Sequence, residues 1–143
     1  MAGDATNKVS KLSSALSGLP TSASDMESLL EAFNEYNATL DSETSYGEGK
    51  WVDQYDDRGF KLNKQKFIPA KLTADDMREL YKDKGLYREA MISAAEYQYG
   101  QMEEGTDKTL AGIQIEQMKK TDRELSISDD IKQDTLDVER YAN

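Results

Sequence analysis

The sequence contains no cysteine and no histidine. Without cysteine the chain can form neither a disulfide bond nor a thiolate metal site. Without histidine it lacks the commonest general base of enzymes and the commonest ligand of transition metals. The segment Asp53 to Lys64 has some features of a calcium loop, but it lacks the glutamate required at the last position. We therefore expect a protein that is not an enzyme, with no catalytic residue, no cofactor and no metal site.

Long apolar runs are also absent. No stretch approaches the ~20 consecutive apolar residues that a membrane-spanning helix needs. The first residues lack the apolar core of a cleaved secretion signal. We expect no direct membrane span. The localisation stays open between export without a cleaved signal, a place in a virion, and the cytoplasm.

Basic residues are in the minority. The chain has 18 lysines and arginines against 28 acidic residues, a net charge of −10. Binding to a nucleic-acid backbone requires a basic face, so we expect no nucleic-acid partner. Only the segment 51–86 is slightly basic, with eight basic and seven acidic residues, and acidic segments lie on either side of it. A mean hydropathy of −0.80 is typical of helices that each bury one narrow stripe.

These patterns predict a mainly α protein with an antiparallel helical hairpin or coiled-coil core and a small insert that contains a β-hairpin. Residues 25–143 form one helical domain, with the insert at 42–72. Residues 1–24 form a flexible segment in which Val9, Leu12 and Leu16 have heptad spacing. Two interpretations of that segment remain open: a weak amphipathic helix, or a disordered tail.

Apolar spacing predicts helices at 25–40, 74–84, 86–103 and 106–143. Ser24 and Glu27 resemble a capping box for the first helix, and Thr73 is a second N-cap. Ser126 to Ser128 indicates a break in the last helix, with Ser128 as a new cap. The candidate core residues are Leu30, Phe33, Leu40, Met77, Leu80, Met91, Leu110, Ile113 and Met118.

The segment 50–68 predicts a hairpin, because Asp56 to Gly59 is typical of a tight turn and alternating residues follow it. Trp51 is either an anchor for a partner or, in the interpretation we favour, a plug beneath the hairpin. The tyrosines near residues 81–99 fit helix–helix seams better than an outer interface.

Three pieces of the chain resemble the extracellular filament and needle-tip proteins of bacterial type III secretion systems, the EspA and IpaD kind. The pieces are Tyr55 to Asn63 followed by Phe67, Leu72 to Leu86, and Ile113 to Met118. They are similar to the turn and strand of that family's central module, to its short helix with a following Gly-Leu, and to the start of its long C-terminal helix. The resemblance implies a coiled-coil core and a place in a secretion filament or needle tip.

We therefore expect a non-enzymatic structural or interaction subunit that assembles through helix packing with itself or with other subunits. A virion protein of a tailed phage, such as a head, connector or internal protein, is the alternative. A small acidic enzyme or ligand-binding domain is the third class. The candidate interface residues are Trp51, Tyr55, Lys61, Lys64, Lys66, Ile131, Val138 and Tyr141.

Overall fold

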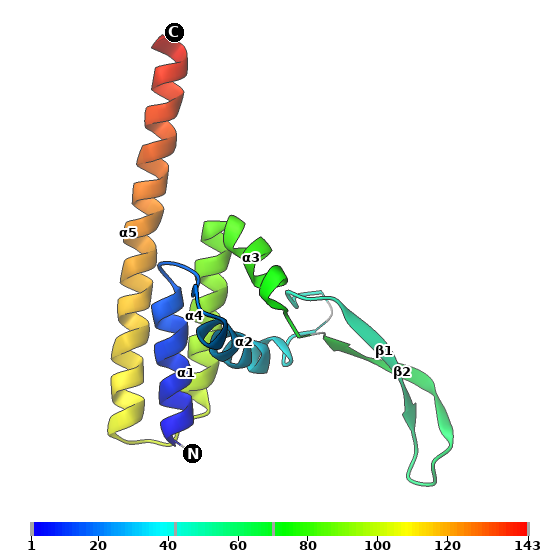
Figure 1. Ribbon diagram of the computed structural model, residues 1–143. Helices are drawn as coiled ribbons and strands as arrows, with labels where there is room; N and C mark the ends of the chain where they lie inside the picture. Colours follow the sequence, from blue (N-terminus) through cyan, green and yellow to red (C-terminus); the bar gives the residue numbers. More distant parts are fainter. Residues whose placement is uncertain (1, 42, 70, 143) are drawn as a thin grey trace.

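The computed structural model describes the backbone of residues 2–41, 43–69 and 71–142, and the side chains of residues 5–41, 43–68 and 71–132. Over these residues the chain forms five helices and one antiparallel hairpin of two strands (Figure 1). The elements are α1 (Ala2–Ala15), α2 (Ala23–Asn37), β1 (Gly49–Tyr55), β2 (Lys61–Pro69), α3 (Ala74–Lys82), α4 (Lys84–Gly100) and α5 (Thr106–Ala142). The predicted fold class is confirmed.

The core is a bundle of α1, α4 and α5, with α2 crossing α1 and α4, and α3 covering part of α2 and α4 (Figure 1). The helices α4 and α5 run antiparallel. Beside them lies α1, in the place that the sequence assigned to the 25–40 helix. Its Val9 and Leu12 are fully buried, so the heptad spacing near the N-terminus reflects a real packing face. The largest fully buried side chains are Leu12, Leu29, Phe33, Met77, Tyr87, Met91 and Met118.

Local side-chain bonds explain where the shorter helices begin. The Thr73 side chain accepts the N–H of Asp76, and the Asp76 carboxylate accepts the N–H of Thr73, so the predicted cap of α3 is a full capping box. The cap predicted at Ser24 is wrong by two residues, since the Ser22 hydroxyl accepts the N–H of Asp25 at 3.2 Å. Two nearby serines satisfy the same local rule, and the structure uses the earlier one.

The predicted break at 126–128 is also wrong, because α5 is continuous from Thr106 to Ala142. Ser128, the predicted cap, lies within this helix and begins no new one, and the Ser126 hydroxyl accepts a hydrogen bond from the Arg88 guanidinium at 3.4 Å. At about 1.5 Å per residue, 37 residues make a helix of about 55 Å, roughly twice the length of the 17-residue α4. The C-terminal part of α5 therefore extends past the rest of the bundle (Figure 1).

The turn of the hairpin is as predicted. Gly59 has φ +86°, a conformation that glycine adopts without steric cost. An Asp56 carboxylate oxygen accepts the N–H groups of Arg58 and Phe60, both at 2.9 Å. These bonds fix the tip of an arm that projects away from the bundle (Figure 1).

Candidate functional site

The long helix α5 carries apolar residues on two opposite faces. The inner face packs on α1 and α4 with Ala111, Ile115 and Met118, each at most 5% exposed. The other face has four exposed aliphatic side chains, which we call the outer stripe: Leu110 (55% exposed), Ile113 (53%), Ile127 (60%) and Ile131 (59%). A helix of a single folded chain needs only one apolar face, so the outer stripe is the first candidate surface for a partner.

The prediction that Leu110 and Ile113 belong to the core is wrong. Leu110 and Ile113 are exposed, because the helix turns Ile115 and Met118 toward the bundle and leaves these two on the opposite side. Of the other predicted core residues, Phe33, Met77, Met91 and Met118 are buried, whereas Leu30, Leu40 and Leu80 are partly buried. The buried face of α5 therefore lies about half a helical turn away from the face that Leu110 and Ile113 predicted.

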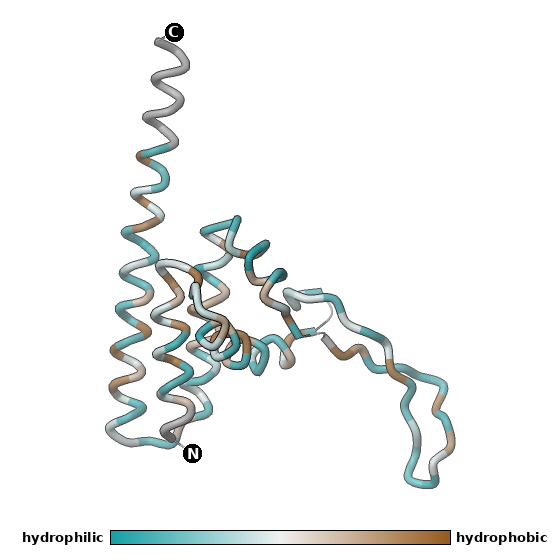
Figure 2. The backbone as a smooth tube through the Cα atoms, in the orientation of Figure 1, coloured by the Kyte–Doolittle hydropathy of each residue, from teal (hydrophilic) through white to brown (hydrophobic). Residues whose placement is uncertain are grey.

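The outer stripe follows the spacing of a coiled-coil seam. Leu110 and Ile131 are three heptads apart and occupy one apolar position of the heptad. Ile113 and Ile127 are two heptads apart and occupy the other apolar position. Polar residues fill the positions between them, which leaves an apolar patch at each end of the stripe. Figure 2 shows apolar segments that continue along α5 beyond the end of α1.

Near Ile113 the stripe borders a shallow hollow. The ring of Tyr99 lies over Gly112, where an added Cβ would come within 3.2 Å of a ring carbon. The Lys108 ammonium lies 5.0 Å from the centre of the same ring. Glycine at position 112 therefore lets α4 and α5 approach closely.

A buried arginine ties α5 to α4 near the end of the bundle. Arg88 is 5% exposed, and its guanidinium donates to Asp122 at 2.8 Å and to Asp129 at 3.1 Å. Burial by itself would lower the pKa of Arg88, but the bonds to Asp122 and Asp129 outweigh it and raise that pKa above its usual value. Arg88 therefore stays charged and sets the point at which α5 leaves the bundle.

The hairpin is the second candidate surface. Its exposed apolar side chains are Trp51 (61% exposed), Tyr55, Phe60 and Ile68. The predicted interface residues Lys61, Lys64 and Lys66 are exposed on β2, with Lys61 paired to Tyr55 and with Lys64 and Lys66 on the face opposite Trp51. Trp51 is no plug, since it makes an edge contact with Phe67 at a centroid distance of 5.4 Å and faces solvent. The structure thus brings together five of the predicted interface residues, from Trp51 to Lys66, on one arm.

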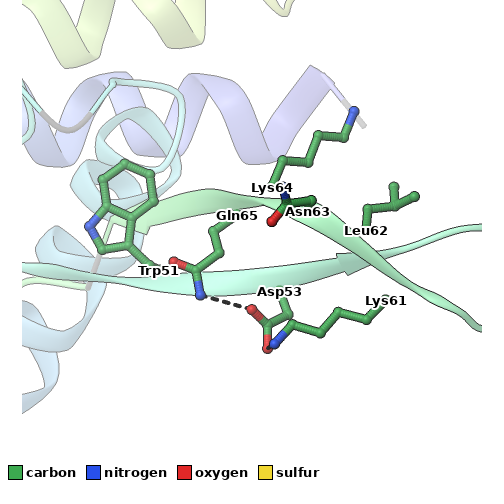
Figure 3. Close-up of a pocket in the computed structure, with 7 residues that line it drawn as sticks. All are labelled: Trp51, Asp53, Lys61, Leu62, Asn63, Lys64 and Gln65. Atoms are coloured by element: carbon green, nitrogen blue, oxygen red, sulfur yellow. Dashed lines mark hydrogen bonds and ion pairs between the residues drawn. The ribbon is translucent and has the colours of Figure 1, made fainter.

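One face of the arm is hollowed between the two strands. Trp51 and Asp53 of β1 line this hollow together with residues 61–65 of β2 (Figure 3). Gln65 donates to the Asp53 carboxylate at 2.8 Å, and the Lys61 ammonium lies 3.4 Å from it. The hydrogen bond from Gln65, aided by the charge of Lys61, holds the pKa of Asp53 below its usual value. Lys61 is therefore engaged within the hairpin, while Lys64 and Lys66 extend as exposed cations.

Two asparagines of α2 hold the base of the hairpin. The Asn34 amide makes a pair of bonds with the backbone of Leu72, accepting at 2.8 Å and donating at 3.2 Å. The Asn37 side-chain oxygen accepts the N–H of Tyr46 at 2.9 Å, and the Tyr46 ring meets Phe33 edge-on. Because α2 bonds to the chain both before β1 and after β2, the base of the hairpin is fixed against the bundle.

The three remaining predicted interface residues lie near the end of α5. Ile131 is exposed at the projecting end, whereas the side chains of Val138 and Tyr141 lie outside the described ones.

Sequence reasoning missed Arg88, Asn34 and Asn37, because each acts on a partner that is distant in the sequence or on a backbone group. The tyrosine seams are confirmed in part: the fully buried Tyr87 donates to the carbonyl of Ala15 at 2.5 Å.

Within the described part of the chain, no cluster of three or more acidic side chains could hold a metal ion, and no helix is long and apolar enough to span a membrane. The two candidate surfaces are the outer stripe of α5 and the hairpin. In comparisons with known proteins, no family model, no curated protein and no solved structure matches this chain.

Proposed function

We propose that this protein is a non-enzymatic structural subunit that assembles with copies of itself, alone or with further subunits, through the outer stripe of α5. The observation that carries the proposal is the second apolar face of a helix whose first face is already buried. The proposal includes the secretion filament or needle tip that the sequence resemblance implies. A hairpin and a short helix that precede a long C-terminal helix fit that expectation.

The projecting end of α5 supports the same conclusion energetically. An isolated helix is only marginally stable in water, and most helices depend on the packing of an apolar face. Ile127 and Ile131 each leave more than half of the side chain in water. Burying such a side chain contributes about 1.5–3 kcal/mol. A partner that covers both would stabilise the contact and the end of the helix together.

Light scattering of the purified chain over a range of concentrations tests the proposal. We expect the wild type to exceed its monomer mass of 16.1 kDa as concentration rises. The variant Ile127→Gln/Ile131→Gln should remain monomeric and keep its helical circular dichroism, because glutamine is a good helix former and both sites are exposed. Leu86→Gln removes an exposed aliphatic side chain from α4 and serves as the matched control, expected to assemble normally.

Two results would contradict the proposal. One is a wild type that stays monomeric at the highest soluble concentration. The other is a stripe variant that assembles like the wild type. The secretion assignment has its own test, which is release into the medium by cells with an intact type III apparatus and no release when the apparatus is disabled.

A further inference from the structure

We propose that the occupant of the projecting end of α5 is the β-hairpin of a second copy of this chain. This inference rests on the proposed function and names the surface that the outer stripe meets. The two surfaces have opposite charge. The strand β2 contains Lys61, Lys64 and Lys66 and no acidic residue. Residues 127–143 contain five acidic and two basic residues.

The apolar parts of the two surfaces also complement each other. Alternate residues of a strand share a face, so Lys64 and Lys66 lie with the exposed Ile68 on the face of the hairpin opposite the contact between Trp51 and Phe67. The helix end offers Ile127 and Ile131. Lys64 and Lys66 beside Ile68 would face carboxylates of the helix end such as the exposed Asp130, which fixes the orientation of the contact.

Within one molecule the described parts of these two surfaces lie apart. The hairpin projects sideways from the bundle, whereas α5 extends beyond one end of it (Figure 1). The roots of the two elements are fixed, the hairpin by Asn34 and Asn37 and the helix by Arg88. The contact must therefore join different copies. Since it uses two different patches, it is head-to-tail, and repetition produces a ring or an open filament.

A lipid surface fits the hairpin less well. The tip of the arm carries Asp56 and Asp57, and the whole chain has a net charge of −10. Both oppose approach to an anionic bilayer. Lys64, Lys66 and Ile68 lie along one face of β2, where a helix can lie against them.

Charge reversal of each surface tests the contact. Lys64→Glu/Lys66→Glu reverses the hairpin, and Asp130→Lys/Asp134→Lys reverses the helix end. Each variant alone should associate at least about tenfold more weakly than the wild type in light scattering, because like charges would then face each other. An equimolar mixture should recover association, since each reversed surface then meets an opposite one. Arg78→Glu/Lys82→Glu makes the same charge change on the exposed face of α3 and should associate like the wild type.

Salt provides a second readout. Raising ionic strength from ~0.1 M to ~1 M shortens the Debye length from ~10 Å to ~3 Å, so wild-type association should weaken. The inference is wrong if the hairpin variant associates like the wild type, or if the mixture associates no better than its parts. If the hairpin variant associates normally while Ile127→Gln/Ile131→Gln does not associate, the proposed function holds, but a surface other than the hairpin covers the end of α5. Binding of the wild type to phosphatidylserine vesicles, lost in the hairpin variant, would assign the arm to a lipid surface and overturn the inference.

Discussion

Arg88 is the residue that connects the fold to the candidate surface. Its guanidinium reaches two carboxylates of α5 and the hydroxyl of Ser126 from a position that is 5% exposed. Arginine suits this place because its planar group donates to several acceptors at once. These bonds hold the part of α5 around Ser126 and Ser128, where the helix is continuous although the sequence alone indicates a break. No local pattern could reveal it, since Asp122 and Asp129 lie 34 and 41 residues away.

Arg88→Met should destabilise the bundle by about 2 kcal/mol, below the 3–5 kcal/mol typical of a broken buried pair. The cost is reduced because the side chains of Asp122 and Asp129 are 30% and 47% exposed and can be hydrated when the arginine is gone. Urea unfolding followed by circular dichroism measures the change. Arg78→Met removes an exposed arginine with a surface ion pair and should change the stability by less than about 0.5 kcal/mol. Equal losses of unfolding free energy in the two variants would show that the buried bonds of Arg88 do not stabilise the contact between α4 and α5.

Glu35 should make stability depend on acid pH. Partial burial acts to raise the pKa of Glu35, but bonds donated by Lys8 and Gln98 outweigh it, so the pKa lies below the usual 4.5. The unfolded chain then takes up the proton first as pH falls. The stabilising contribution is complete above about pH 4.5 and is lost as pH drops through the lowered pKa. The urea midpoint of Glu35→Gln should fall less steeply with acid than that of the wild type; identical slopes would contradict this role.

At the scale of elements, the root of the hairpin depends on a glycine. A Cβ on Gly49 would lie 2.2 Å from the carbonyl oxygen of Ile68 and 2.5 Å from a ring atom of Phe67. Gly49→Ala should therefore force the strands apart at their base, at a cost of about 1–3 kcal/mol. Trp51, the single tryptophan, reports the hairpin directly through its fluorescence. Gly100→Ala is the control, since a Cβ there meets nothing within 4 Å; a hairpin signal unchanged in both variants would be the contrary result.

Local elements were predictable where neighbouring residues alone determine them. The Asp56 to Gly59 turn and the cap at Thr73 are confirmed, because each needs only a few adjacent side chains and backbone groups. The hairpin residues were correctly grouped for the same reason. The exposure of Trp51 was not predictable, since it depends on where the arm points relative to the helices.

The phase of α5 could not be determined from the sequence for a different reason. Leu110 and Ile113 on one side compete with Ile115 and Met118 on the other, and both sets have helical spacing. Only the position of α1 and α4 decides which set is inside. The ambiguity is itself informative, because the second apolar face, which the bundle leaves exposed, is a candidate surface for a partner.

At the scale of the whole molecule, the two exposed surfaces lie on separate projections. The hairpin projects from one side of the bundle, and the end of α5 extends beyond the bundle in another direction (Figure 1). The strand β2 contains three lysines and no acidic residue, whereas residues 127–143 contain five acidic and two basic residues. Contacts between copies would account for both.

Removal of residues 131–143 should separate folding from assembly. The inner contacts of α5 include Ile115, Met118 and the Arg88 bonds, all of which precede the deletion. The truncated chain should keep a cooperative unfolding transition with nearly the same urea midpoint and should remain monomeric. Assembly of the truncated chain as in the wild type, or loss of its folded state, would contradict this division.

Hydrogen exchange followed by mass spectrometry, at dilute and at concentrated protein, tests the central claim most directly. Amides from residue 127 to the end of α5 should exchange rapidly in dilute protein, because this part of α5 extends past the other helices of the bundle (Figure 1). In concentrated protein the same amides should become protected, while the already protected amides around Met118 change little. Protection that is the same at both concentrations, or that appears only outside α5, would contradict a partner surface on this helix.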